Sequence, residues 1–61
     1  MEILDILMNR DGMTQEEASD LINGVRCEVY NILDNGGSYN DIEELMYSEL
    51  GLEMDYIHDI L

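Results

Sequence analysis

Apolar residues recur at spacings of three and four between residues 15 and 34, and no other sequence feature constrains the fold as strongly. The members of this stripe are Ala18, Leu21, Ile22, Val25, Val29, Ile32 and Leu33. The spacing places them on one face of an α-helix, whereas a half-buried strand needs strict alternation, which occurs nowhere in the chain. We therefore predict a long helix over about 15–34 that buries one face.

Two helix starts are marked by capping residues. Thr14 is followed three residues later by Glu17, which is the spacing of a capping box, and Ser38 precedes Asp41 by the same interval. In a capping box the two side chains satisfy backbone N–H groups that the first helical turn leaves free. Each pair therefore predicts the first turn of a helix.

Glycine-containing breaks divide the rest of the chain. They lie at 9–12, 35–37 and 51. Glycine ends helices because it adopts the left-handed conformation without steric cost. The breaks predict further helices over about 2–9, 38–50 and 54–61. We expect a single domain over residues 1–61 that is all-α, a small bundle of three to four short helices.

Some expectations concern single positions. The last helix is expected to bury Tyr56 or Ile57 together with Ile60 and Leu61. Gly24, inside the long helix, costs roughly 1 kcal/mol relative to alanine, which suggests that it admits a close neighbour. Cys27 lies one step off the apolar stripe and is expected to be half-buried.

Acidic residues dominate the charge of the chain. There are fifteen of them against two arginines and no lysine, which gives a formal net charge of -13. A field of this sign repels nucleic acids and anionic membranes and attracts basic proteins. Arg10 and Arg26 alone make no basic footprint, so direct binding of nucleic acid is not expected. The expected partner is a basic protein.

Cysteine usage and hydropathy bear on the compartment. A single cysteine allows no intrachain disulfide, which fits a reducing environment. No signal peptide is recognisable, and no apolar run approaches the ~20 residues that span a bilayer. We expect a cytoplasmic protein.

The sequence contains no convincing metal or catalytic motif. Asn9–Gly12 resembles the core of an EF-hand loop, but Leu7 and Ala18 then occupy the first and twelfth ligand positions, which need oxygen ligands. His58 is the only histidine, and no nucleophile lies near it in the sequence. We expect no metal, no cofactor and no enzymatic activity.

Carboxylates three or four residues apart lie about 5–6 Å from one another on a helix, which is comparable to the spacing of phosphates along a nucleic-acid strand. A helical surface of this kind is able to occupy the phosphate-binding groove of a DNA- or RNA-binding protein. The alternative is a solvated surface that only keeps the protein soluble. The densest acidic positions, and the candidate partner-binding residues, are Glu16, Glu17, Asp20, Asp41, Glu43 and Glu44.

Two other readings remain open. The first predicted helix has more apolar surface than a three-helix core readily covers, which suggests a structural or adaptor protein that forms a homodimer through this helix. The residues of that interface are Ile3, Leu4, Ile6, Leu7 and Met8.

Ser38, at a helix start, is similar to the phosphopantetheine-bearing serine of acyl and peptidyl carrier proteins. Gly37 precedes it where those carriers have aspartate, and Ser38 as a plain helix cap explains the same residues.

The four tyrosines recur at intervals of eight or nine residues. They are Tyr30, Tyr39, Tyr47 and Tyr56. They fit positions at the edge of the core, with the rings half-buried and the hydroxyl groups in contact with water. They also fit a contact surface for an arginine-rich partner. The sequence does not decide between the two.

Two segments, 10–18 and 49–57, resemble short, acidic, mostly uncharacterised proteins of bacteriophages and mobile elements. The shared features are helix caps and apolar positions spread over most of the chain. The resemblance implies a setting in which small acidic proteins include inhibitors of restriction and CRISPR nucleases. No inhibitor motif is recognised, so no inhibitor residue is carried over. The favoured hypothesis is a non-enzymatic nucleic-acid mimic that inhibits such a target.

Overall fold

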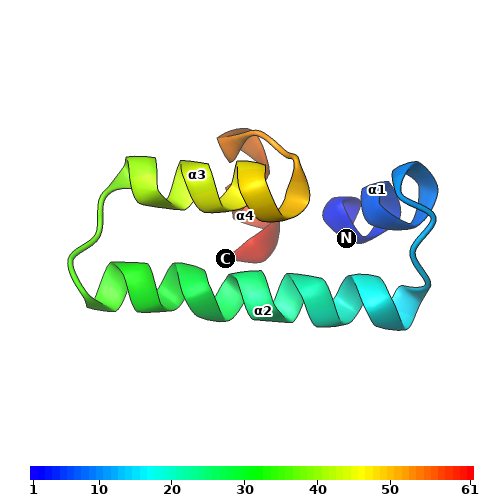
Figure 1. Ribbon diagram of the computed structural model, residues 1–61, viewed down its shortest axis with the longest axis horizontal. Helices are drawn as coiled ribbons and strands as arrows, with labels where there is room; N and C mark the ends of the chain where they lie inside the picture. The colour runs from blue at the N-terminus through cyan, green and yellow to red at the C-terminus, as the bar shows by residue number, and fades with distance from the viewer.

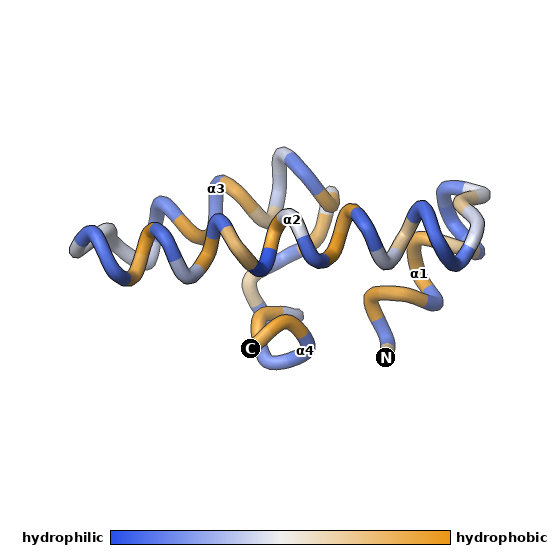
Figure 2. Tube along the Cα trace, turned by 90° about the horizontal axis from the view of Figure 1, so that it is seen from below, coloured by the Kyte–Doolittle hydropathy of each residue, from blue (hydrophilic) through white to orange (hydrophobic).

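The computed structural model describes residues 1–61 and is all-α, which confirms the predicted fold class. Its helices are α1 (Glu2–Arg10), α2 (Gln15–Asp34), α3 (Tyr39–Leu50) and α4 (Ile57–Ile60), and a short 3-10 helix, η1 (Met54–Tyr56), leads into α4. The long helix α2 runs the length of the molecule; α3 lies alongside its C-terminal part, and α1 crosses it obliquely toward its N-terminal end (Figures 1 and 2). The molecule measures 34 × 18 × 17 Å.

The core lies where α1, α3 and α4 meet α2, and every buried side chain in it is apolar. Helix α2 contributes Ala18, Ile22, Val25 and Val29, at the three- and four-residue spacing that the sequence predicted. Figure 2 shows the same pattern as hydrophobic and hydrophilic segments that alternate along α2. The remaining members are Ile3, Leu7, Ile42, Met46, Leu50, Leu52, Ile57 and Ile60.

Both predicted capping boxes are present. The Glu17 N–H donates to Thr14 Oγ1 at 3.1 Å, and the Thr14 N–H donates to Glu17 Oε1 at 2.9 Å. At the start of α3, the Ser38 N–H donates to Asp41 Oδ2 at 3.0 Å and the Asp41 N–H to Ser38 Oγ at 3.4 Å. These bonds satisfy N–H groups of the first helical turns, which have no partner within the helix.

Three charged side chains satisfy helix ends that are remote from them in the sequence. Arg10 donates to the carbonyl oxygens of Leu50 at 2.6 Å and Gly51 at 3.2 Å, where α3 ends. Arg26 donates to the Ile60 carbonyl at 2.8 Å, at the end of α4. Cations suit these positions because the carbonyl end of a helix carries partial negative charge.

The third remote contact joins the two ends of the chain. Asp59 Oδ2 accepts the Ile3 N–H of the first turn of α1 at 2.9 Å. Figures 1 and 2 both show α4 near the start of α1. Because an anion is favoured at a helix N-terminus, this bond helps to hold α1 and α4 together.

Several single-position expectations are wrong. Leu33 and Leu61 are 49% and 58% exposed. Leu33 is one residue, or about 100° of helix, beyond Ile32, so it faces away from α3. Leu61 follows Ile60, which fills the available core space. Cys27 is exposed because it lies two residues, or about 200°, from buried Val25.

The expectation that Gly24 admits a close neighbour is also wrong, and this predicts a stabilising substitution. A Cβ atom at Gly24 would meet nothing within 4 Å. Gly24→Ala should therefore raise the free energy of unfolding by about 0.5–1 kcal/mol, because alanine restricts the unfolded chain and favours helix. Gly37→Ala is the contrasting variant, since its Cβ would lie 2.9 Å from the Ile32 carbonyl oxygen. It should lower stability in the same urea titration.

The α3 cap predicts a second pair of outcomes. Ser38→Ala removes a hydroxyl that accepts a helix N–H and should lower the free energy of unfolding by about 1 kcal/mol. Ser48 is exposed within α3 and serves as the control. Ser48→Ala should leave stability unchanged or raise it slightly, because alanine is the better helix former. Equal losses in urea denaturation would contradict the capping role of Ser38.

Candidate functional site

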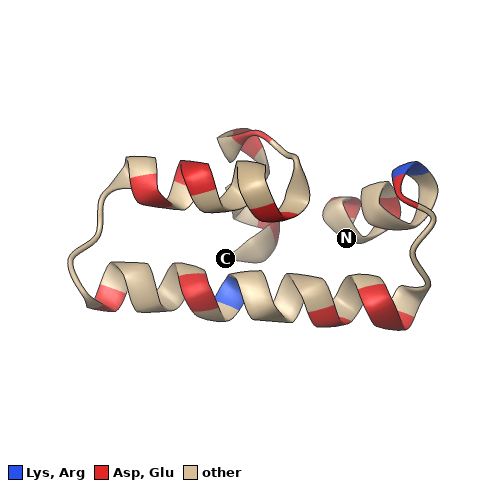
Figure 3. Cartoon of the chain, viewed as in Figure 1, with Lys and Arg blue, Asp and Glu red and all other residues tan.

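Both arginines of this protein form hydrogen bonds within the chain. Both guanidinium groups donate to backbone carbonyls, and Arg10 also pairs with Asp11 at 2.8 Å. Four acids have partners within the chain: Asp11, Glu17, Asp41 and Asp59. The eleven other carboxylates are exposed and form no hydrogen bond: Glu2, Asp5, Glu16, Asp20, Glu28, Asp34, Glu43, Glu44, Glu49, Glu53 and Asp55. Acids occur on all four helices (Figure 3).

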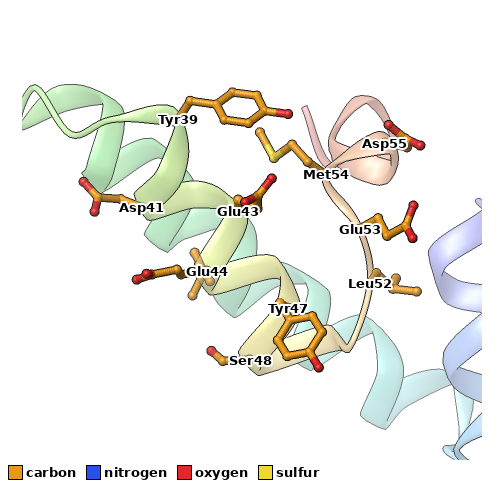
Figure 4. Close-up of a pocket in the computed structure, with 11 residues that line it drawn as sticks. Tyr39, Asp41, Glu43, Glu44, Tyr47, Ser48, Leu52, Glu53, Met54 and Asp55 are labelled. Atoms are coloured by element: carbon orange, nitrogen blue, oxygen red, sulfur yellow. The ribbon is translucent and has the colours of Figure 1, made fainter.

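An open groove of ≈ 890 Å³ lies between α3 and the segment that follows it (Figure 4). Apolar and aromatic side chains form part of its lining: Tyr39, Leu45, Tyr47, Leu52 and Met54. The polar part consists of Ser48 and five acids: Asp41, Glu43, Glu44, Glu53 and Asp55. The groove therefore combines apolar surface with strong negative charge.

Helix periodicity and one turn build this groove. Tyr39, Glu43 and Tyr47 are each four residues apart and so share one face of α3. Gly51 then adopts a left-handed conformation, with φ of 64°, which ends α3 and reverses the chain. The returning segment is anchored by Leu52, which is buried. Figure 4 shows Met54 on that segment pointing toward Tyr39 and Glu43.

Arg10 supports the turn from outside the groove. Its guanidinium lies against Gly51, where an added Cβ would meet the Arg10 Nη2 atom at 3.4 Å, and it bonds the last two carbonyls of α3. Asp11 bonds both Nε and Nη2 of Arg10 at 2.8 Å. The hydrogen bond to Asp11 raises the pKa of Arg10 and lowers the pKa of Asp11.

The predicted partner-binding acids fall into two separate groups. Asp41, Glu43 and Glu44 line the groove. Glu16, Glu17 and Asp20 lie on the first two turns of α2, at the opposite end of the molecule. Asp41 lies close to Gly37, whose N–H donates to the carbonyl of Ile32 near the end of α2. About 18 Å of helix separates that position from Asp20.

Two of the six predicted acids also have a structural role. Glu17 and Asp41 accept hydrogen bonds in the capping boxes. Hydrogen bonds from the Thr14 backbone and then from its hydroxyl lower the pKa of Glu17. Sequence reasoning missed Glu53, Met54 and Asp55, because only the turn at Gly51 brings them beside α3. The spacing of the tyrosines was the one available signal for this face.

Two of the five predicted dimer residues belong to the core. Ile3 and Leu7 have no exposed surface, so the expectation that they lie in a dimer interface is wrong. Leu4, Ile6 and Met8 are half-buried against the same core and keep part of their surface exposed. Homodimerisation stays a prediction without a defined interface.

The remaining candidate residues from the sequence, Ser38, His58 and Cys27, lie at a helix cap or on the surface. Ser38 serves as the N-cap of α3. His58 and Cys27 are exposed, and neither takes part in a side-chain hydrogen bond to a neighbouring group. No cluster of three or more histidine, cysteine or acidic side chains is suited to hold a metal ion. None of the helices has the length and apolar character needed to cross a membrane.

The groove is the only site that combines a cavity with exposed chemistry, and its charge favours a cationic ligand. Comparisons with protein-family models, curated proteins and solved structures gave no match. The function is therefore inferred from the residues and their geometry.

The hydrogen bonds of Glu17 predict a pH-dependent contribution to stability. Its pKa in the folded state lies below the ordinary value of 4.5. The unfolded state therefore binds more protons as pH falls through and below that value, and the stabilising contribution is lost there. Glu17→Ala should be less stable than the unmodified protein at pH 7, and the difference should shrink below about pH 4.5.

The matched variant for this test is Glu16→Ala, because Glu16 is exposed and forms no hydrogen bond. It removes the same charge from the same helical turn. Urea titrations at several pH values measure both variants. Identical pH profiles would contradict a specific role for the Glu17 cap.

Proposed function

We propose that this protein is a non-enzymatic acidic interaction protein that occupies the nucleic-acid-binding surface of a basic protein. The observation that supports this most directly is the engagement of both arginines with backbone carbonyls. Neither arginine bonds any of the eleven exposed, unpartnered carboxylates. The outer surface therefore attracts lysine- and arginine-rich proteins over long distances.

The charge density also supports nucleic-acid mimicry. The formal net charge is -13, and the molecule is 34 Å long. A duplex carries one charge per about 1.7 Å, or about 20 charges over the same length. The protein thus has roughly two-thirds of the linear charge density of DNA. When a basic groove binds this protein instead of a duplex, fewer counterions are released, because the charge density of the protein is lower. The physical effect that favours binding is the same.

The resemblance to bacteriophage and mobile-element proteins narrows the class of target. In that setting a restriction or CRISPR nuclease is the kind of basic protein that such a surface would inhibit. The inhibitor acts by competition, because it occupies cationic side chains that otherwise contact phosphates. It needs no catalytic residue of its own.

Competition with DNA tests this function. The tagged protein is incubated with bacterial lysate at physiological salt, and retained proteins are eluted with excess duplex DNA and identified by mass spectrometry. We expect a basic nucleic-acid-binding protein that DNA displaces. The purified target should then lose DNA binding when the acidic protein is added. Recovery of many basic proteins that leave together as salt rises would contradict the proposal.

A charge-neutralised variant provides the control for that experiment. It combines Glu16→Gln, Asp20→Asn, Glu43→Gln and Glu44→Gln and spares the capping acids Glu17 and Asp41, so its helices should persist in circular dichroism. At about 0.4 kcal/mol for each of the four exposed charges, it should bind the target about 15-fold more weakly. Unchanged affinity would show that these carboxylates do not contact the target.

A further inference from the structure

We propose that the groove between α3 and the segment 52–55 is a docking site for an extended, arginine-bearing segment of the partner protein. The inference rests on the proposed function, because it names the part of the acidic surface that a basic partner contacts. The groove is not a uniform acidic patch, since five of its eleven lining residues are apolar or aromatic. Its volume of ≈ 890 Å³ is in the range of pockets that hold ligands larger than a single side chain.

The aromatic residues of the groove are left open to solvent. Tyr39 is 63% exposed and Tyr47 is 73% exposed, the highest values among the large hydrophobic side chains. Glu43 lies between them on the same face of α3, one turn from each. Residues four apart on a helix have Cβ atoms about 5–6 Å from each other, so a cation that pairs with Glu43 is one helical turn from each tyrosine, and a turn of either exposed side chain brings its ring within cation–π reach.

This arrangement favours arginine over lysine. A guanidinium group is planar, bonds a carboxylate through two N–H groups and stacks on aromatic faces, whereas an ammonium group is a compact, strongly hydrated charge. Met54, which is only half-buried, offers apolar surface for the methylene stem of an arginine side chain. Glu53 and Asp55, on the other side of the groove, offer carboxylates to a second basic residue of the same segment.

Charge excludes other occupants of the groove. Anionic ligands are repelled by five lining carboxylates. A second copy of this chain cannot supply the guanidinium group, because Arg10 and Arg26 are both bonded to backbone carbonyls. A basic segment of another protein remains the complementary ligand.

Two labelled peptides test the inference directly. One alternates glycine with arginine, the other alternates glycine with lysine, and they have equal length and charge. Fluorescence anisotropy at physiological salt should show that the full-length protein binds the arginine peptide about fivefold more tightly, which corresponds to about 1 kcal/mol gained by planar stacking of one guanidinium group beyond what an ammonium group gains on the same ring. Equal affinity for the two peptides would overturn the inference.

Matched variants locate the binding site. Tyr47→Ala should remove most of the preference for arginine, whereas Tyr30→Ala, on the exposed face of α2, should leave it intact. Glu43→Gln should weaken binding of the arginine peptide more than Glu28→Gln, which removes an equally exposed charge from α2. If the groove and control variants behave alike, the groove is not the docking site.

The outcomes separate this inference from the proposed function. Binding of both peptides with no preference and no effect of the groove variants refutes the groove while leaving a general attraction to basic partners intact. Absence of binding to either peptide refutes the groove and also removes support for the proposed function. Perturbation of backbone amide resonances in 39–55, mapped by NMR during titration with the arginine peptide, should agree with the variant data.

Discussion

The contact between Arg10 and the end of α3 ties together parts of the chain that are far apart in the sequence. It joins the last residue of α1 to the carbonyls of Leu50 and Gly51, some forty residues later in the chain. Because α1 and α3 pack against different parts of α2, this contact links the two helices directly to each other. It also holds the turn at Gly51, which sends the chain back along α3 and so forms one wall of the groove.

Both arginines of this chain, whose net charge is -13, donate to carbonyls at helix ends. At those positions they offset the partial negative charge of the helix ends. Only Arg10 also pairs with a carboxylate, that of Asp11. The mutual repulsion of the remaining exposed acids is opposed by an entirely apolar core.

The groove shows how an acidic surface acquires specificity. Net charge attracts any basic protein and is screened by salt. In the proposed docking site, Tyr39 and Tyr47 would add short-range contacts whose strength depends on the shape of the cation, and Glu43 between them would orient it. A uniform acidic surface lacks this second component, so the aromatic positions distinguish the proposed docking site from the acids on α2.

The helices could be predicted from the sequence because their signals are local. The period of the α2 stripe, the boxes at Thr14 and Ser38 and the stop at Gly51 each act within a few residues. Contacts across the chain could not be predicted in this way. Nothing near Arg10, Arg26 or Asp59 in the sequence indicates which remote helix end each one satisfies, and the exposure of Leu33 depends on where α3 crosses α2.

The helical class, the approximate bounds of the first three helices and the sign of the net charge follow from local sequence signals, because propensity, capping and composition do not depend on distant residues. The predicted helix over 54–61 is instead the 3-10 helix η1 followed by the short α4. Only the tertiary structure decided which acids lie together. It placed Glu16 and Asp20 at one end of α2 and brought Glu53 and Asp55 beside Glu43. Packing of the apolar core and the turn at Gly51 set the distances between segments. These distances do not produce a repeating pattern in the sequence, so sequence periodicity does not predict them.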